Sequence, residues 1–258
     1  MTTSPTVDTQ ELDAKVKAMY RDVAKEPGGE YHFELGRPLA EQLGYPSAEL
    51  DRIPAGAIES FAGVGYFFDL AGLKPGESVL DLGSGSGMDV FFAANQVGAS
   101  GRVVGLDFTA EQLEKARALA AEHGFDQVEL REGRIESPPA GDGTLDCVIS
   151  NGVVNLSPQK ERVFAEAARA LRPGGRLAIA DIVSEQQLKE SIVCDADLWA
   201  SCIGGAAQQD AYRDAIEAAG LRVEQLRENP YRFISGRAQD ASSKYGVKSV
   251  SVLARKER

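Results

Sequence analysis

The chain has 258 residues, 43% of them hydrophobic and 26% charged, which is typical of a globular protein and excludes a disordered or fibrous one. Its 28 Lys and Arg residues against 39 Asp and Glu residues give a formal net charge of -11, which argues against nucleic acid or an anionic membrane surface as a partner. The length predicts one catalytic-size domain with additions.

The start of the chain and its cysteines predict a compartment. The first ten residues have neither the basic start nor the apolar stretch of a secretory signal, and no run approaches the roughly 18 apolar residues that cross a bilayer. We therefore expect a cytoplasmic protein. Cys147, Cys194 and Cys202 form no CxxC pair, so we expect no metal site, and any functional cysteine would be a free thiol.

Residues 1–71 are predicted to form an N-terminal helical cap or lid. A helix is expected over residues 11–24, because apolar residues follow one another at spacings of four, three and four, at Leu12, Val16, Met19 and Val23. A shorter helix is expected over residues 38–43, and a third begins near Pro54. The aromatic residues of this segment could form an apolar lid over a substrate or simply pack the cap on the rest of the protein.

Residues 72–258 show short β-rich runs that alternate with helices, which is typical of βαβ units. The strands are expected at residues 78–82, 102–106, 128–131, 145–150 and 175–181, with two late strands at 221–226 and 247–253. The helices are expected at residues 88–97, 110–123, 160–170, 188–199 and 209–219. The predicted fold class is α/β, with a doubly wound, mostly parallel, seven-stranded Rossmann-like sheet below an N-terminal helical cap.

A glycine-rich loop follows the first predicted strand directly, as Gly83-Ser84-Gly85-Ser86-Gly87. Small residues let a ligand touch the backbone there, and the N–H groups at the start of the next helix favour polar groups. The spacing is G-x-G-x-G, where a dinucleotide fingerprint has G-x-G-x-x-G, and the acid Asp89 follows two residues later. A pyrophosphate is therefore disfavoured.

Acidic and polar residues close the first four predicted strands. Asp81 precedes the loop and suits an ammonium group, while Asp107 ends the second strand, 24 residues after Gly83, and suits a ribose diol. Ile135-Glu136 follows the third strand, and Ser150-Asn151-Gly152 follows the fourth. Ligands of open α/β sheets bind at these carboxyl ends. Two carboxylates suit a cationic nucleoside without phosphate, and S-adenosylmethionine is such a nucleoside.

These segments resemble the class I S-adenosylmethionine-dependent methyltransferases and, within them, look most like the arsenite methyltransferase family. The resemblance covers residues from about 45 to 221, and its most similar segments are residues 79–87, 104–113, 150–156, 171–175 and 198–206. It implies the methyltransferase form of the Rossmann-like sheet, S-adenosylmethionine as the cofactor and no required metal.

The resemblance also implies a cofactor-binding role for individual positions. Besides Asp81, they are Gly83, Ser84 and Gly85 at the methionine part, Asp107 at the ribose, Phe108, Gln112, Ile135 and Glu136 near the adenine, and Asn151 near the reacting methyl. Two alternatives stay open: Phe108 could be ordinary core, and Gln112 could be a solvated helix residue.

Trivalent arsenic needs soft thiolate ligands, which leave its lone pair free to attack a methyl carbon. The family pattern has cysteine at three positions, where this chain has Val64, Gly152 and Cys202. A single protein thiolate would need a small thiol such as glutathione to complete the coordination. Cys202 is expected in an accessible turn of small residues, although a structural role stays open. Cys194 lies eight residues earlier, and one uninterrupted helix would bring both thiols to one side.

The leading hypothesis is an S-adenosylmethionine-dependent methyltransferase of arsenite or a related thiophilic small molecule, with Cys202 and Asn151 as the candidate catalytic residues. One alternative is a methyltransferase of a small organic acceptor, such as a quinone, a sterol-like molecule or a natural product, with His32 as a candidate general base. Another is a protein that binds S-adenosylmethionine without catalysis. A third, a nicotinamide-dependent oxidoreductase, is disfavoured by the glycine spacing.

Overall fold

The computed structural model describes residues 7–200 and 202–257, so the parts of the predicted cap and of the Cys202 segment at residues 1–6 and 201 lie outside the described residues. The strands are β1 (Ser78–Leu82), β2 (Arg102–Asp107), β3 (Val128–Glu132), β4 (Leu145–Asn151), β5 (Leu171–Ser184), β6 (Ala207–Gln208), β7 (Leu221–Glu228) and β8 (Lys248–Lys256). The seven predicted strands are confirmed, and the two-residue β6 is an eighth that was not predicted.

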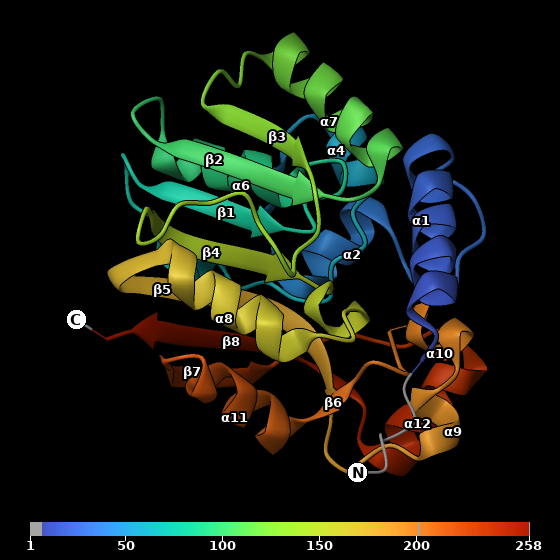
Figure 1. The fold of residues 1–258 in the computed structure, drawn as a ribbon. Helices are drawn as coiled ribbons and strands as arrows, with labels where there is room; N and C mark the ends of the chain where they lie inside the picture. Colours follow the sequence, from blue (N-terminus) through green and yellow to red (C-terminus); the bar gives the residue numbers. More distant parts are fainter. Residues whose placement is uncertain (1–6, 201, 258) are drawn as a thin grey trace.

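The sheet has the order β3-β2-β1-β4-β5-β8-β7, with β6 paired to β5. β1 to β5 run parallel, whereas β8 runs antiparallel to both β5 and β7. The chain moves outward from β1 to β3 and then returns to β4 on the other side of β1, so β1 and β4 flank the switch point where such sheets bind ligands. In Figure 1 the arrowheads of β1, β2 and β4 point toward α1 (Thr9–Lys25).

Helices cover both faces of the sheet. They are α2 (Gly36–Leu43), α3 (Ser47–Leu50), α4 (Ala55–Glu59), α5 (Phe68–Ala71), α6 (Met88–Val97), α7 (Ala110–His123), α8 (Lys160–Ala170), α9 (Glu190–Val193), α10 (Ala196–Ala200), α11 (Gln209–Ala218) and α12 (Gly236–Tyr245). Alternate strand residues enter two apolar clusters, one with α2, α4, α6 and α12 and the other with α8 and α11. The predicted doubly wound α/β class is therefore confirmed.

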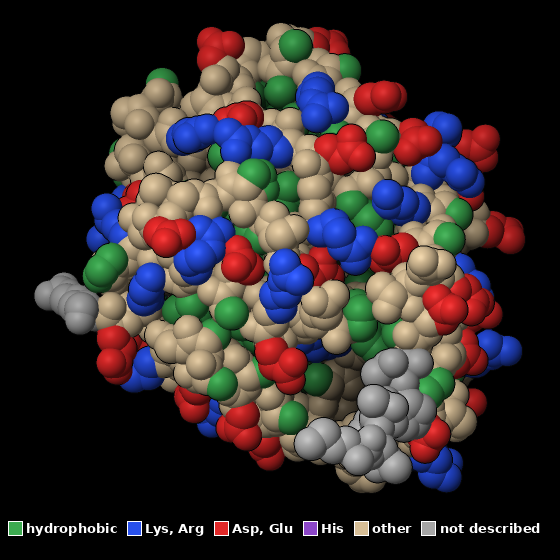
Figure 2. Space-filling view, in the orientation of Figure 1, with side chains coloured by type: hydrophobic (Ala, Val, Ile, Leu, Met, Phe, Trp, Pro, Cys, Tyr) green, Lys and Arg blue, Asp and Glu red, His purple; other side chains and the backbone are tan. Residues whose placement is uncertain are grey.

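The helix α1 lies across the carboxyl edge of the sheet, where it packs on α7 and α10 (Figure 1). It begins after Asp8, whose carboxylate accepts the N–H groups of Gln10 and Glu11. Among the described residues, no helix is long and apolar enough to span a membrane. Lys and Arg side chains alternate with Asp and Glu side chains over the face seen in Figure 2.

The predicted helix over residues 188–199 is wrong, because α9 and α10 are separate. Cys194 closes α9, and the carboxylate of Asp195 then caps α10 by accepting the N–H groups of Asp197 and Leu198. Cys194 and Cys202 therefore do not lie two turns apart on one helix. α12 was also missed, since its sequence of Gly, Arg, Gln and Ser residues has little apolar periodicity.

Candidate functional site

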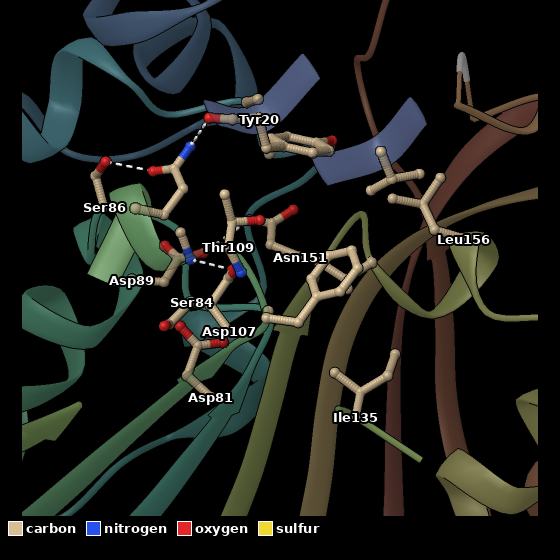
Figure 3. A pocket seen from close by; sticks show the side chains of 18 of the residues that line it. Tyr20, Asp81, Ser84, Ser86, Asp89, Asp107, Thr109, Ile135, Asn151 and Leu156 are labelled. Carbon is tan, nitrogen blue, oxygen red and sulfur yellow. Dashed lines mark hydrogen bonds between the residues drawn. The ribbon is translucent and has the colours of Figure 1, made fainter. Parts of the chain in front are cut away.

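A pocket whose empty volume, open solvent included, is about 1020 Å³ lies at the carboxyl ends of β1, β2 and β4. Every residue predicted to contact the cofactor lines it: Asp81, Gly83, Ser84, Gly85, Asp107, Phe108, Gln112, Ile135, Glu136 and Asn151. Figure 3 shows Asp81 and Asp107 below the cavity and Tyr20 of α1 above it. The fold thus brings together residues that are spread over 71 positions of the sequence, from 81 to 151.

The glycine loop is fixed to β2 by its backbone. The N–H groups of Gly83 and Ser84 both donate to the carbonyl of Leu106, at 2.7 and 2.9 Å. Gly83 has a φ of +79°, and a Cβ there would meet Cγ2 of Val153 at 2.4 Å, so only glycine fits. Ser84 lines the pocket, and its buried hydroxyl has no partner among the described residues. That hydroxyl is available to a ligand, which supports the predicted contact.

Asp107 joins the loop to the start of α7. Its Oδ2 accepts the N–H of Gly85 at 2.9 Å, and its Oδ1 accepts the N–H of Thr109 at 2.8 Å. A carboxylate oxygen accepts two hydrogen bonds, so each oxygen keeps one lone pair for a ligand. Burial raises the pKa of Asp107, and the backbone bonds oppose this rise. The geometry is that of a preorganised acceptor for two hydroxyl groups.

Four buried carboxylates line this one pocket. Glu136 is paired with Arg134, whereas Asp81, Asp89 and Asp107 have no ion pair among the described residues. Burial raises the pKa of Asp81 well above its usual value, and the neighbouring charges of Asp89 and Asp107 add to the effect. Burial also raises the pKa of Asp89 to about 6, against hydrogen bonds from Tyr45 and Asn151 that lower it. A cation would relieve this concentration of like charge, whereas a pyrophosphate would increase it.

Apolar and cationic groups form the side of the pocket near Phe108. The ring of Phe108 has Nζ of Lys17 at 5.0 Å from its centroid and the guanidinium of Arg134 at 6.0 Å. Arg134 is held by Asp13 and Glu136, and Glu136 also accepts the Ser157 hydroxyl at 2.6 Å. Since the charge of Arg134 is already matched by two carboxylates, the side of the pocket near Phe108 suits an uncharged nucleobase.

Gln112 is buried, so it is not a solvated helix residue. Its Oε1 accepts the hydroxyl of Ser86, and its Nε2 donates to the carbonyl of Tyr20 at 2.8 Å. Gln112 therefore ties the glycine loop to α1. Leu12, Val16 and Tyr20 of α1 line the pocket as well. The helix α1 is thus one wall of the site.

Asn151 lines the pocket, and its side-chain atoms are engaged by other parts of the protein. Its Oδ1 accepts the N–H groups of Val64 and Gly65 at 2.7 and 3.2 Å. Its Nδ2 lies 3.0 Å from the carbonyl of Gly65, 3.0 Å from Oδ2 of Asp89 and 3.1 Å from the hydroxyl of Tyr45. This arrangement suits a residue that holds the cap in place.

Two of the three positions at which the family resemblance has cysteine face each other. A Cβ on Gly152 would meet Cγ1 of Val64 at 3.2 Å, and Gly152 has a φ of +73°. Val64 is buried, and the side chains of Phe61 and Asn151 lie beside the neighbouring Gly63. These two positions therefore form a buried apolar wall at the end of β4, and neither of them lines the pocket.

The third position, Cys202, lies in a tight turn after α10 with a φ of +61°. It is half-buried and packs against the same apolar cluster as Tyr20 and Phe108, although it is not one of the residues that line the pocket. Burial raises the pKa of Cys202 to about 12, Asp181 adds to the rise, and a hydrogen bond with Asn155 opposes it. The turn of small residues is as expected, but its thiol is less accessible than predicted.

The other residues considered from the sequence, Cys147, His32 and Cys194, do not line the pocket. Cys147 is fully buried in β4, and burial raises its pKa to about 12, in agreement with an inert core residue. Burial lowers the pKa of His32, and its Nε2 has no partner among the described residues.

Sequence reasoning missed Asp89, Thr109 and Arg134 as residues that line the site, and it named Tyr20 only among the aromatic residues of a possible lid. The sequence analysis noted Asp89 only as an acid unfavourable to pyrophosphate. Its position two residues after the glycine loop could have indicated that it lines the pocket together with Asp81 and Asp107. Tyr20 and Arg134 come from elements whose packing on the sheet edge has no local sequence signature.

Comparisons with known proteins agree with this geometry. A family model described as a methyltransferase domain matches residues 73–220. An arsenite methyltransferase of Halobacterium salinarum is 38% identical over 219 residues, which cover 84% of this chain and 56% of that protein. An arsenite methyltransferase of Aquipseudomonas alcaligenes is 42% identical over 164 residues, covering 61% of this chain and 47% of that protein. The chain spans about half the length of these curated relatives.

A solved structure is also similar. The X-ray crystal structure of an arsenic(III) S-adenosylmethionine methyltransferase from Chlamydomonas reinhardtii superposes with a TM-score of 0.70 at 32% sequence identity. The match covers 82% of this chain and 73% of that one.

Proposed function

Since the chain belongs to the S-adenosylmethionine-dependent methyltransferases, we propose that it transfers the methyl group of that cofactor to trivalent arsenic or a related thiophilic small molecule. The observation that supports this proposal is the pocket. In it, three buried carboxylates without an ion pair and a serine hydroxyl without a partner among the described residues meet at the switch point of the sheet. S-adenosylmethionine, when bound, supplies a methyl group on a positively charged sulfur.

Each part of the pocket has a role in this proposal. Asp81 and Asp89 hold the ammonium group, and Asp107 accepts hydrogen bonds from the ribose hydroxyls with the lone pairs that Gly85 and Thr109 leave free. The ring of Phe108 packs on the adenine. The cap, described here for residues 7–71, excludes water through α1, whose apolar residues form one wall of the pocket.

Cys202 is the proposed protein ligand of the acceptor. Its thiol exchanges with one small thiol on arsenic, such as glutathione: the arsenic–sulfur bond to Cys202 forms, and the displaced thiol leaves with the proton. S-adenosylmethionine, when bound, would supply the methyl group, and the sulfur of Cys202 would hold arsenic with its lone pair free for that group. Most of the acceleration comes from holding donor and acceptor in line. We place this reaction in the cytoplasm.

A specific observation favours a second candidate, methylation of a small organic acceptor. The apolar side chains of Phe61, Val153 and Leu156 line the pocket, and burial raises the pKa of Cys202 to about 12. An apolar lining suits a quinone or another neutral carbon skeleton, which needs no thiolate.

One experiment tests the proposal and separates the candidates. The purified protein is incubated with labelled S-adenosylmethionine, arsenite and glutathione, beside a panel of organic acceptors. Label on arsenic that requires glutathione supports the leading proposal, and label on an organic acceptor alone supports the second. Isothermal titration that gives no binding of S-adenosylmethionine would contradict both.

A further inference from the structure

Three side chains from separate parts of the chain form a closed hydrogen-bonded triangle at the donor pocket. The hydroxyl of Tyr45 donates to Oδ1 of Asp89 at 2.6 Å. Nδ2 of Asn151 lies 3.0 Å from Oδ2 of Asp89 and 3.1 Å from the Tyr45 oxygen. Tyr45 is 2% exposed and Asp89 is 5% exposed, so these bonds are made away from bulk water. Asp89 and Asn151 also line the pocket (Figure 3).

Asn151 extends this triangle to residues 63–66, which we call the strap. Its Oδ1 accepts the N–H groups of Val64 and Gly65, and its Nδ2 donates to the carbonyl of Gly65. From the opposite side, the hydroxyl of Ser249 in β8 donates to the carbonyl of Val64 at 2.6 Å. The strap is thus held between the end of β4 and β8, and it carries the Val64 half of the apolar wall.

The amide of Asn151 has two protons and three acceptors within reach: Asp89, Tyr45 and Gly65. An ionised carboxylate is the strongest of these acceptors, because charge assistance shortens and strengthens the hydrogen bond. A cation bound in the pocket beside Asp89 stabilises its ionised form. Donor binding therefore strengthens the bonds of Asp89 to Tyr45 and Asn151, and through Asn151 it fixes the strap.

We propose that Tyr45 and Asn151 are positioning residues that couple occupation of the donor pocket to the strap, whose Gly63 lines that pocket. The inference rests on the proposed function for the identity of the donor. Because coupling between two sites is reciprocal, an acceptor that binds against the ordered strap would in turn tighten donor binding.

Hydrogen–deuterium exchange of the full chain, read on peptides that cover residues 61–68, tests the coupling with S-adenosylmethionine as the probe. We expect the probe to slow exchange of the Val64 and Gly65 amides about 5-fold or more in the parent protein. Tyr45→Phe keeps the buried ring and removes only the hydroxyl, and it should abolish most of this protection at a saturating concentration of the probe.

Tyr212→Phe is the matched control, because the Tyr212 hydroxyl also donates at 2.6 Å to a buried carboxylate, that of Asp181, outside the triangle. It should keep the protection of the strap. Equal protection in Tyr45→Phe and the parent would overturn the coupling, as would a parent strap that does not respond while titration shows the probe bound. Titration without binding overturns the proposed function as well. If Tyr45→Phe does not fold, the exchange measurement on the parent protein still tests the coupling, because a strap that does not respond to the bound probe overturns it.

Discussion

The donor side and the acceptor side of the site are built on opposite principles. On the donor side, Asp81, Asp89 and Asp107 are buried around one cavity, and the backbone of the glycine loop is bound to the carboxylate of Asp107 and to β2. On the proposed acceptor side, Val64 and Gly152 meet in an apolar contact, and the Cys202 thiol lies in a turn after α10. In the proposed function, donor recognition thus depends on charge and hydrogen bonds that are already in place, whereas acceptor recognition depends on few groups.

This difference indicates at which positions the acceptor specificity could change with little loss of donor binding. A donor-side carboxylate takes part in several bonds at once, so its replacement disturbs the loop and the helices around it. The side chain of Val64 makes no hydrogen bond, so a change there leaves the carboxylates and the glycine loop of the donor pocket in place.

Cys202→Ser tests the acceptor side most directly. If arsenic is the acceptor, the loss of its one protein ligand should lower methylation of arsenite by about 100-fold or more, because the acceptor is no longer held in line with the methyl group. Binding of S-adenosylmethionine, measured by titration, should not change. Cys194→Ser is the control and should keep full activity. Methylation of arsenite at the parent rate by Cys202→Ser would show that the thiol takes no part.

The double variant Val64→Cys with Gly152→Cys should convert the apolar wall into a thiolate pair. Val64→Cys is included because a Cβ at position 152 would meet the Val64 side chain at 3.2 Å. The φ of +73° leaves the substitution at position 152 strained in any case, and the melting temperature of the double variant measures that strain. We expect arsenite to bind on the order of 100-fold more tightly, because added ligands on one scaffold act at high effective concentration. Tryptophan fluorescence with arsenite measures this, and unchanged affinity would place the acceptor elsewhere.

Asp107→Ala tests the donor side. Removal of the ribose acceptor should weaken binding of S-adenosylmethionine by about 1–3 kcal/mol, which is roughly 5–150-fold in the dissociation constant. Glu132→Ala is the control, since Glu132 pairs with Asp107 in the β2–β3 register but is exposed outside the pocket. Titration heats that match in both variants would reject the placement of the ribose. Melting temperatures show how much of the loss comes from loosening of the glycine loop.

The pH dependence of donor binding should be the smallest effect. The pKa of Asp89 is raised to about 6, so the folded protein without ligand holds this proton more tightly than the unfolded chain, and its stability falls as the pH rises from about 4 to 6. A cationic donor requires the ionised form, so its affinity should rise between pH 5 and 7, by at most about tenfold per pH unit for each proton released. Titration at both pH values should show a weaker dependence in Asp89→Asn, and an equal slope would assign it to Asp81 or Asp107.

Much of the fold could be predicted because its signals are local. The limits of α6, α7 and α8 follow from apolar periodicity and from the glycines and the loop residues beside them, and β1 follows from a short run that ends in the glycine loop. The helix predicted over residues 188–199 was wrong because Asp195 caps a new helix in the middle of an apolar pattern. β6 has only two residues, too few for any periodicity.

The candidate site could also be predicted in part from local signals in the sequence. The cofactor positions predicted from the sequence all line one pocket, because the carboxyl ends of parallel strands must meet at one edge. Whether those residues act as predicted is tested by the variants above. The partners of Asn151 could not be predicted, since they lie 62 to 106 positions away along the chain and meet it only through the packing of the cap.

By itself, the sequence determined the doubly wound sheet, the glycine loop and the acids at the strand ends, because each depends on residues that are neighbours along the chain. Only the tertiary structure decided that Asp89 and Tyr45 join the site, that Val64 faces Gly152, and that the Cys202 thiol is shielded. These features depend on how α1 and the strap pack over the sheet edge. Such packing is set by contacts between distant segments, which local patterns do not encode.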